Sequence, residues 1–171
     1  MQNIFLIGFM GTGKSTVASM FRNRKQLQLI DMDQKIEKQE GMTISEIFEK
    51  YGEEYFRELE TKLLKKIQQR DNQIVSCGGG VVLRDENVKI MRQNGVIVLL
   101  CAQPATILER VKRGKNRPLL NGHMEESYIA ELMEKRHAKY RSAADIVVHT
   151  DGKNKVEICN EIIEKLKNRR E

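Results

Sequence analysis

Residues 8–15 constrain this chain more than any other segment. Their sequence, Gly-Phe-Met-Gly-Thr-Gly-Lys-Ser, matches the phosphate-binding pattern G-x-x-x-x-G-K-[ST] at every fixed position. An apolar run at residues 3–7 predicts a strand before the motif, and residues 15–21 read as a helix after it. An ordinary glycine turn is the alternative, but motif and context together favour a phosphate loop. The sequence therefore predicts binding of a nucleoside triphosphate and leaves open which group accepts the phosphoryl.

The residue types in this motif suit that chemistry. Glycines let backbone N–H groups wrap a polyphosphate, and the helix that follows turns the positive end of its dipole toward it. Lys14 is long enough to reach the β- and γ-phosphates, and the Ser15 hydroxyl can ligate Mg²⁺.

Composition narrows the class of protein. A chain of 171 residues with 32% charged and 40% hydrophobic residues predicts one domain with a real core. The longest apolar run, residues 96–102, is too short to span a bilayer, and the N-terminus lacks the features of a signal peptide. Three cysteines without framework spacing predict reduced thiols in a cytoplasm. The net charge of +6 suits nucleic acid or small anions, but no basic run is interleaved with aromatics, so we expect no nucleic-acid partner.

Strands and helices alternate along the chain, which favours an α/β fold around a parallel sheet. Strands are predicted at residues 2–7, 27–30, 73–77, 96–101 and 145–149. Residues 112–124 have no period, and their length and basic character predict a lid between two helices.

Two aspartates follow the second predicted strand. Asp31 and Asp33 should lie at the carboxyl edge of the sheet, on the same side and about 7 Å apart if the chain is extended. One can support the metal while the other meets an acceptor hydroxyl. The alternative is that Asp33 only caps a helix beginning at Gln34. Since no acid ends the strand 96–101, we assign the magnesium role to Asp31.

Glycines and arginines supply the other candidates. Residues 78–80 are three glycines after a strand, and they would let the backbone approach a ligand closely. Arg57 and Glu60 share a helix face, and Arg136 lies in the register of an apolar stripe, although surface ion pairs could explain each of them. Arg117, just before Pro118, is the cation that the lid could bring to a transferring phosphoryl group.

Together these segments resemble the shikimate kinase family. The matching pieces are GFMGTGKST (8–16), DMD (31–33), FRELE (56–60), GGG (78–80), RPLL (117–120) and KRHAKY (135–140), in the family's order and spacing. The resemblance implies phosphorylation of the 3-hydroxyl of shikimate by ATP, on the route to chorismate and the aromatic amino acids. It also implies a three-layer αβα fold like that of the nucleoside monophosphate kinases, with five parallel strands in the order 2-3-1-4-5.

On the acceptor side, the resemblance implies substrate contacts at Asp33, Arg57, Gly79 and Arg136. Asp33 would hold the ring hydroxyls and accept the proton of the attacking one. Arg57 and Arg136 would clamp the carboxylate, which overrides the surface reading of Arg57, and Glu60 would orient Arg57.

On the nucleotide side, the resemblance implies that the ATP phosphates meet the phosphate loop and the lid. The residues are Gly11, Thr12, Gly13, Lys14, Ser15, Thr16 and Arg117. Ser15 would bind Mg²⁺ directly and Asp31 through water, while Arg110 and Lys153 match adenine-contacting positions. Departures from the usual family residues occur at Met32, at Ser76-Cys77 and in the segment 151–153, which stands in the family's variable adenine loop.

Two alternatives stay open. A gluconate or nucleotide kinase on the same fold has close chemistry, although the FRELE, GGG and RPLL segments argue for shikimate. A non-catalytic ATP-binding regulator should have lost the lysine or the acceptor aspartate, and both are present. We expect ATP and shikimate as the small-molecule partners, no membrane association and a monomer.

Overall fold

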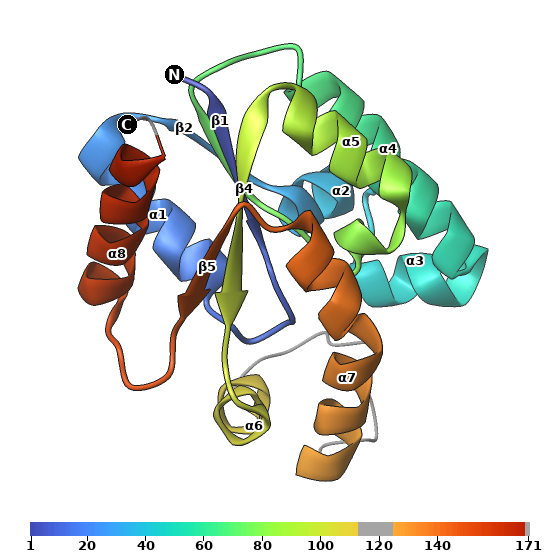
Figure 1. The fold of residues 1–171 in the computed structure, drawn as a ribbon. Coiled ribbons are helices and arrows are strands. Elements are labelled where there is room, and N and C mark those ends of the chain that lie inside the picture. The colour runs from blue at the N-terminus through green and yellow to red at the C-terminus, as the bar shows by residue number, and fades with distance from the viewer. Residues whose placement is uncertain (113–124, 170–171) are drawn as a thin grey trace.

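Five parallel strands form the centre of the protein, in a computed structural model that describes residues 1–112 and 125–169 (Figure 1). The strands are β1 (Asn3–Ile7), β2 (Gln28–Asp31), β3 (Gln73–Ser76), β4 (Gly95–Cys101) and β5 (Ile146–His149). They lie in the order β2-β3-β1-β4-β5, and every pair is parallel. The predicted strand order is therefore confirmed, and each predicted strand overlaps an observed one.

Eight α-helices are present in the described residues. They are α1 (Lys14–Lys25), α2 (Met32–Glu40), α3 (Ile44–Tyr51), α4 (Glu53–Ile67), α5 (Asp85–Gln93), α6 (Pro104–Lys112), α7 (Glu126–Ala143) and α8 (Lys155–Asn168). A 3₁₀ turn, η1 (Val81–Leu83), precedes α5. We predicted no helix at residues 85–93 from the sequence, because the apolar face of that stretch consists only of Val88, Ile90 and Met91. The predicted lid begins where α6 ends, and its residues 113–124 lie outside the described part.

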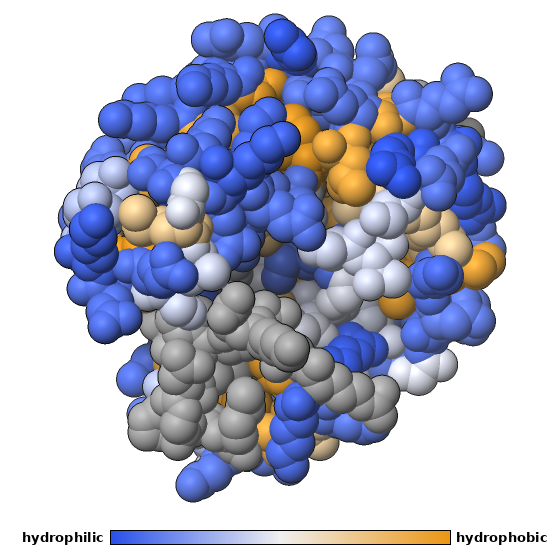
Figure 2. All heavy atoms as spheres, turned by 180° about the vertical axis from the view of Figure 1, so that it is seen from behind, coloured by the Kyte–Doolittle hydropathy of each residue, from blue (hydrophilic) through white to orange (hydrophobic). Residues whose placement is uncertain are grey.

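Alternation along β1 sorts the core into two layers. Phe5 and Ile7 pack into a cluster on the side of α2 to α5 and α7, whereas Ile4 and Leu6 pack on the side of α1 and α8. Figure 1 shows the two groups of helices on opposite sides of the strands. Seen from behind, the surface is mostly hydrophilic, with hydrophobic side chains gathered in limited patches (Figure 2). Burial on both faces explains why the strands are apolar throughout rather than alternating.

The turn after β2 differs from the prediction. Helix α2 begins at Met32, and it is Asp31 whose carboxylate accepts the capping hydrogen bond from the Gln34 N–H, at 3.2 Å. The reading of Asp33 as a cap for a helix starting at Gln34 is therefore wrong. The assumption of an extended chain between the two aspartates is wrong as well, because Asp33 already lies in the first helical turn.

Candidate active site

The phosphate loop joins β1 to α1 at the carboxyl edge of the sheet. Gly13 caps α1 with φ of 93°, a left-handed conformation that a side chain disfavours. The Lys14 ammonium lies against the loop and donates to the carbonyls of Gly8 at 2.6 Å and Phe9 at 2.9 Å. Thr12 is buried and its hydroxyl donates to Phe9 O at 2.8 Å, so its side chain stabilises the loop, and Thr12 is absent from the lining of the cavity beside the loop.

A cavity of about 540 Å³ opens beside this loop. Its walls include most residues that the sequence predicted for the site: Gly11, Gly13, Lys14, Ser15, Thr16, Asp31, Asp33, Gly79 and Arg110. The cavity brings together the ends of three strands, because β1, β2 and β3 all direct their carboxyl ends to this edge. The prediction that the glycine triplet and the aspartates lie at the carboxyl edge of the sheet is therefore confirmed, and Asp31, Asp33 and Gly79 line the cavity there.

Three oxygen-bearing side chains meet at the base of the loop. The Ser15 hydroxyl donates to Asp31 Oδ2 at 2.7 Å, and the Ser76 hydroxyl lies 3.3 Å from Ser15 Oγ. In the described part of the chain, no three His, Cys, Asp or Glu residues cluster as a metal cage. Mg²⁺ is usually held by one or two oxygen ligands together with phosphates and water, so a serine and a carboxylate in contact fit that ion.

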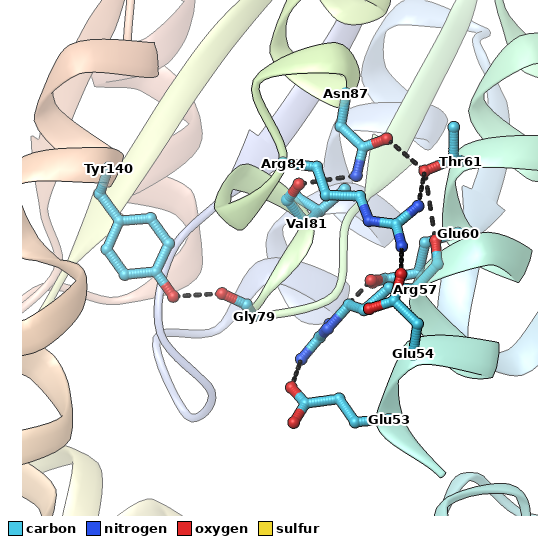
Figure 3. A network of polar contacts seen from close by, with 10 residues as sticks. All are labelled: Glu53, Glu54, Arg57, Glu60, Thr61, Gly79, Val81, Arg84, Asn87 and Tyr140. Carbon is cyan, nitrogen blue, oxygen red and sulfur yellow. Dashed lines mark hydrogen bonds and ion pairs between the residues drawn. The ribbon is translucent and has the colours of Figure 1, made fainter. Parts of the chain in front are cut away.

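Arg57 and Glu60 form a buried ion pair on α4. Arg57 Nη1 donates to Glu60 Oε1 at 2.7 Å, and Arg57 Nη2 donates to Glu53 Oε1 at 2.9 Å (Figure 3). Glu60 is fully buried, and this burial raises its pKa to about 7, although the charge and hydrogen bond of Arg57 oppose the rise. The sequence alternative of a surface ion pair is therefore wrong for Arg57, which is 6% exposed.

Arg136 approaches the glycine triplet from the other side. It lies on α7, is 7% exposed, and its guanidinium stands 5.8 Å from the centre of the Phe9 ring. Its Nη1 atom is buried without a hydrogen-bond partner among the described residues. One turn further along α7, the Tyr140 hydroxyl donates to Gly79 O (Figure 3). A buried guanidinium with an unsatisfied N–H is suited to an anion, since leaving a charged donor unpaired is costly.

The remaining predicted residues are Arg110, which lies in the cavity wall, Lys153 and Arg117. Arg110 donates to Gly11 O at 3.0 Å, which attaches α6 to the loop. Lys153 is bonded to Glu161 Oε2 at 2.7 Å and does not line the cavity. Arg117 belongs to residues 113–124, which are not described.

Sequence reasoning missed four residues that support the site. Ser76 was noted only as a departure from the family pattern, yet its hydroxyl lies beside Ser15. Thr61 and Asn87 are buried polar residues that hydrogen-bond to each other at 2.7 Å (Figure 3). Tyr140 entered the sequence analysis only as the last residue of KRHAKY (135–140), and its hydrogen bond to the triplet had no signal beyond its spacing from Arg136.

The family model described as shikimate kinase matches residues 10–167 of this chain. A shikimate kinase of Thermodesulfovibrio yellowstonii is 45% identical over 163 residues, which covers 95% of this chain and 94% of the relative. One of Dehalococcoides mccartyi is 44% identical over 96% of this chain and 93% of the relative. This chain belongs to the shikimate kinase family.

Solved structures agree with this assignment. The shikimate kinase of Acinetobacter baumannii in complex with shikimate superposes with a TM-score of 0.94 at 32% identity, covering 99% of this chain and 94% of the other. A gluconokinase from Sinorhizobium meliloti reaches a TM-score of 0.61 at 18% identity, and that likeness shows the fold alone. The comparisons thus confirm the predicted family and P-loop kinase fold, and they favour the shikimate kinase reading over the gluconate or nucleotide kinase alternative. In the described residues, no helix is long and apolar enough to cross a membrane.

Proposed function

We propose that this protein transfers the γ-phosphoryl group of ATP to the 3-hydroxyl of shikimate, giving shikimate 3-phosphate and ADP. The observation that carries the proposal is the placement of two buried arginines, Arg57 and Arg136, against neighbouring residues of one glycine loop beside a complete phosphate loop. Two guanidinium groups at such a place suit a compact carboxylate, which each can bind through paired N–H donors. Membership of the shikimate kinase family supports the same substrate.

On the acceptor side, Arg57 and Arg136 hold the carboxylate and Asp33 holds the ring hydroxyls. Asp33 lies in the first turn of α2 and lines the same cavity as Lys14, so a hydroxyl bonded to it faces the phosphate loop. An ionised Asp33 can accept the proton of that hydroxyl as the phosphoryl group arrives. Glu60 keeps the Arg57 guanidinium in place through the 2.7 Å bond, and the Gly79 backbone contributes to the wall of the acceptor pocket.

On the nucleotide side, backbone N–H groups of Gly11 to Thr16 cradle the phosphates and Lys14 meets the β- and γ-oxygens. Ser15 and Asp31 are the residues that hold Mg²⁺, which when bound neutralises charge on those oxygens. We assign Arg117 to the transferring phosphoryl group. Arg110, at the edge of the loop, and Lys153, next to the end of β5, are assigned to the adenosine.

We further propose that the protein works as a monomer in the cytoplasm. Apart from Arg117, the residues assigned to both substrates are supplied by the described part of a single chain. The three cysteines are all free, in keeping with a reducing compartment. The site has a carboxylate clamp and a phosphate loop, so its partners are ATP and shikimate and not a nucleic acid.

The test is a comparison of acceptors. ADP release is followed with ATP, Mg²⁺ and, in parallel, shikimate, gluconate or a nucleoside monophosphate, and the product is identified by mass spectrometry. We expect turnover with shikimate far above the other two. Gluconate also carries a carboxylate and hydroxyls, so comparable turnover with gluconate would refute the substrate assignment, and ATP hydrolysis without any phosphorylated acceptor would refute the kinase.

A further inference from the structure

Charged side chains of the site pack directly against the backbone of the glycine triplet. A Cβ atom added to Gly80 would lie 2.4 Å from Arg57 Nη2 and 2.5 Å from Arg57 Cζ. A Cβ added to Gly78 would lie 2.7 Å from Glu60 Oε2 and 3.0 Å from Asp33 Oδ1. Distances below 3 Å exclude an alanine at either position unless the charged groups move. The space that a side chain would fill at these two glycines is therefore occupied by the side chains of Arg57, Glu60 and Asp33.

Backbone conformation does not explain these glycines. None of residues 78–80 has φ in the left-handed region, in contrast to Gly13 of the phosphate loop. Gly80 has φ of −103° and ψ of 8°, which other residues adopt. Glycine is required at this position because it has no side chain, and the Arg57 guanidinium lies where a Cβ atom would be.

A buried hydrogen-bond chain holds this loop at a set distance from α4. Asn87, fully buried on α5, donates from Nδ2 to Val81 O at 2.8 Å, and its Oδ1 accepts from the Thr61 hydroxyl at 2.7 Å (Figure 3). Thr61 lies one turn beyond Arg57 on α4, and its hydroxyl also stands 3.2 Å from Arg57 O. The helix that carries the guanidinium and the loop that receives it are thus joined by Thr61 and Asn87.

We infer that Gly80 is a positioning residue, because its missing side chain leaves the space, here called the seat, in which the Arg57 guanidinium lies. Thr61 and Asn87 fix the distance between this seat and α4, so that all three residues set the affinity for the acceptor carboxylate. The inference rests on the proposed function, in which Arg57 binds that carboxylate. None of the three residues need touch the substrate. Their effect should appear in acceptor binding and be absent from ATP binding, which occurs at the phosphate loop.

The first arm of the experiment is Gly80→Ala in the full-length protein. The methyl group should displace the Arg57 guanidinium and break its bond to Glu60, which a crystal structure without substrates detects directly. The dissociation constant for shikimate, measured by calorimetry, should rise at least about tenfold, while that for ATP alone should stay within about twofold of the wild type. Leu83→Ala, at an exposed position in the same turn, is the matched control and should leave both constants unchanged.

A double-mutant cycle distinguishes an effect of Gly80→Ala that acts through Arg57 from a direct steric effect of the methyl group on the ligand. If Gly80 acts through Arg57, then adding Gly80→Ala to Arg57→Ala should weaken shikimate binding by less than about twofold further. A full additional loss in the double variant would mean that the methyl group blocks the ligand itself, and it would overturn the inference.

The second arm uses two variants of Thr61 that differ in one hydroxyl. Thr61→Val keeps the shape but removes the donor to Asn87, and the KM for shikimate should rise several-fold, on the order of the effect of one buried hydrogen bond, with a smaller change in kcat. Thr61→Ser keeps the hydroxyl and should restore the wild-type KM even if its stability is lower. Equal KM values for the two variants would remove Thr61 and Asn87 from the proposal.

The outcomes distinguish this inference from the proposed function. An undisplaced Arg57 in the Gly80→Ala crystal structure overturns the seat, whatever the acceptor is. A displaced Arg57 with unchanged shikimate affinity overturns the link between seat and carboxylate. A wild-type protein that does not bind shikimate overturns both the proposed function and that link, while the crystal structure still decides whether Gly80 seats Arg57.

Discussion

Replacing Glu60 by glutamine tests whether one buried carboxyl controls how the stability of this protein depends on pH. The Glu60 side chain is fully buried and its Oε1 lies 2.7 Å from Arg57 Nη1. Burial raises its pKa from the ordinary 4.5 to about 7, the charge of Arg57 opposes the rise, and the nearby charge of Asp33 adds to it. The folded protein therefore binds this proton more tightly than the unfolded chain does.

The sign of the effect follows from that difference. Between pH 4.5 and about 7, the folded state holds the Glu60 proton while the unfolded chain releases it, so the free energy of unfolding decreases as pH rises. This stabilisation is fully present below pH 4.5 and is lost as pH rises through about 7, and the pKa difference corresponds to about 3 kcal/mol. Glutamine cannot titrate. The wild-type free energy of unfolding minus that of Glu60→Gln should therefore fall by about 3 kcal/mol across this window.

The assay is urea unfolding followed by circular dichroism at a series of pH values from about 4.5 to about 8.5, with the free energies obtained by linear extrapolation. Glu53→Gln is the matched control, because it removes the other carboxylate that is paired with Arg57. The Glu53 side chain is 50% exposed. Water reaches the Glu53 side of this ion pair and screens it, so the pair contributes about 1 kcal/mol or less, and this variant should keep the pH profile of the wild type. A wild-type minus Glu60→Gln difference that is flat, or that increases with pH, would refute the reasoning.

Three further predictions concern the reaction. Lys14→Ala should lower kcat by at least ~10²-fold in steady-state assays, because a preorganised charge at the β- and γ-phosphates is lost, and near-normal turnover by a folded variant would contradict its role. Arg136→Ala should weaken shikimate binding by roughly 1.5–3 kcal/mol in calorimetry without changing ATP affinity, since a charge-assisted pair is removed, and the opposite pattern would refute the carboxylate clamp. Arg117→Ala should reduce kcat strongly and leave the shikimate dissociation constant nearly unchanged, whereas a loss confined to shikimate binding would exclude its assignment to the phosphoryl group.

The sequence alone was sufficient to predict those parts of the site that are formed by residues adjacent in the chain. The phosphate loop is one continuous segment, and its strand and helix follow from local periodicity. The strand order was inferred from the family resemblance and is confirmed by the sheet. The turn at Asp31 shows where local reasoning failed: two alternating residues look the same in an extended chain, but α2 starts at Met32 and gives the cap to Asp31. The predicted strand and β2 are equally long, so what differs is the residue at which the strand ends and the helix begins, and such boundaries are poorly marked in sequence.

Tertiary structure alone decided how the charged residues are used. Arg57 and Arg136 come from α4 and α7, distant in the sequence, and both are buried against the glycine triplet. The pKa of Glu60 depends on how many atoms of other elements exclude water from it, which no local pattern records. The need for glycine at residue 80 has the same origin, since it arises from a guanidinium that α4 places over the loop. Residue types along the chain determined which chemistry is available, whereas burial and distance, which are properties of packing between elements, determined which charges act together.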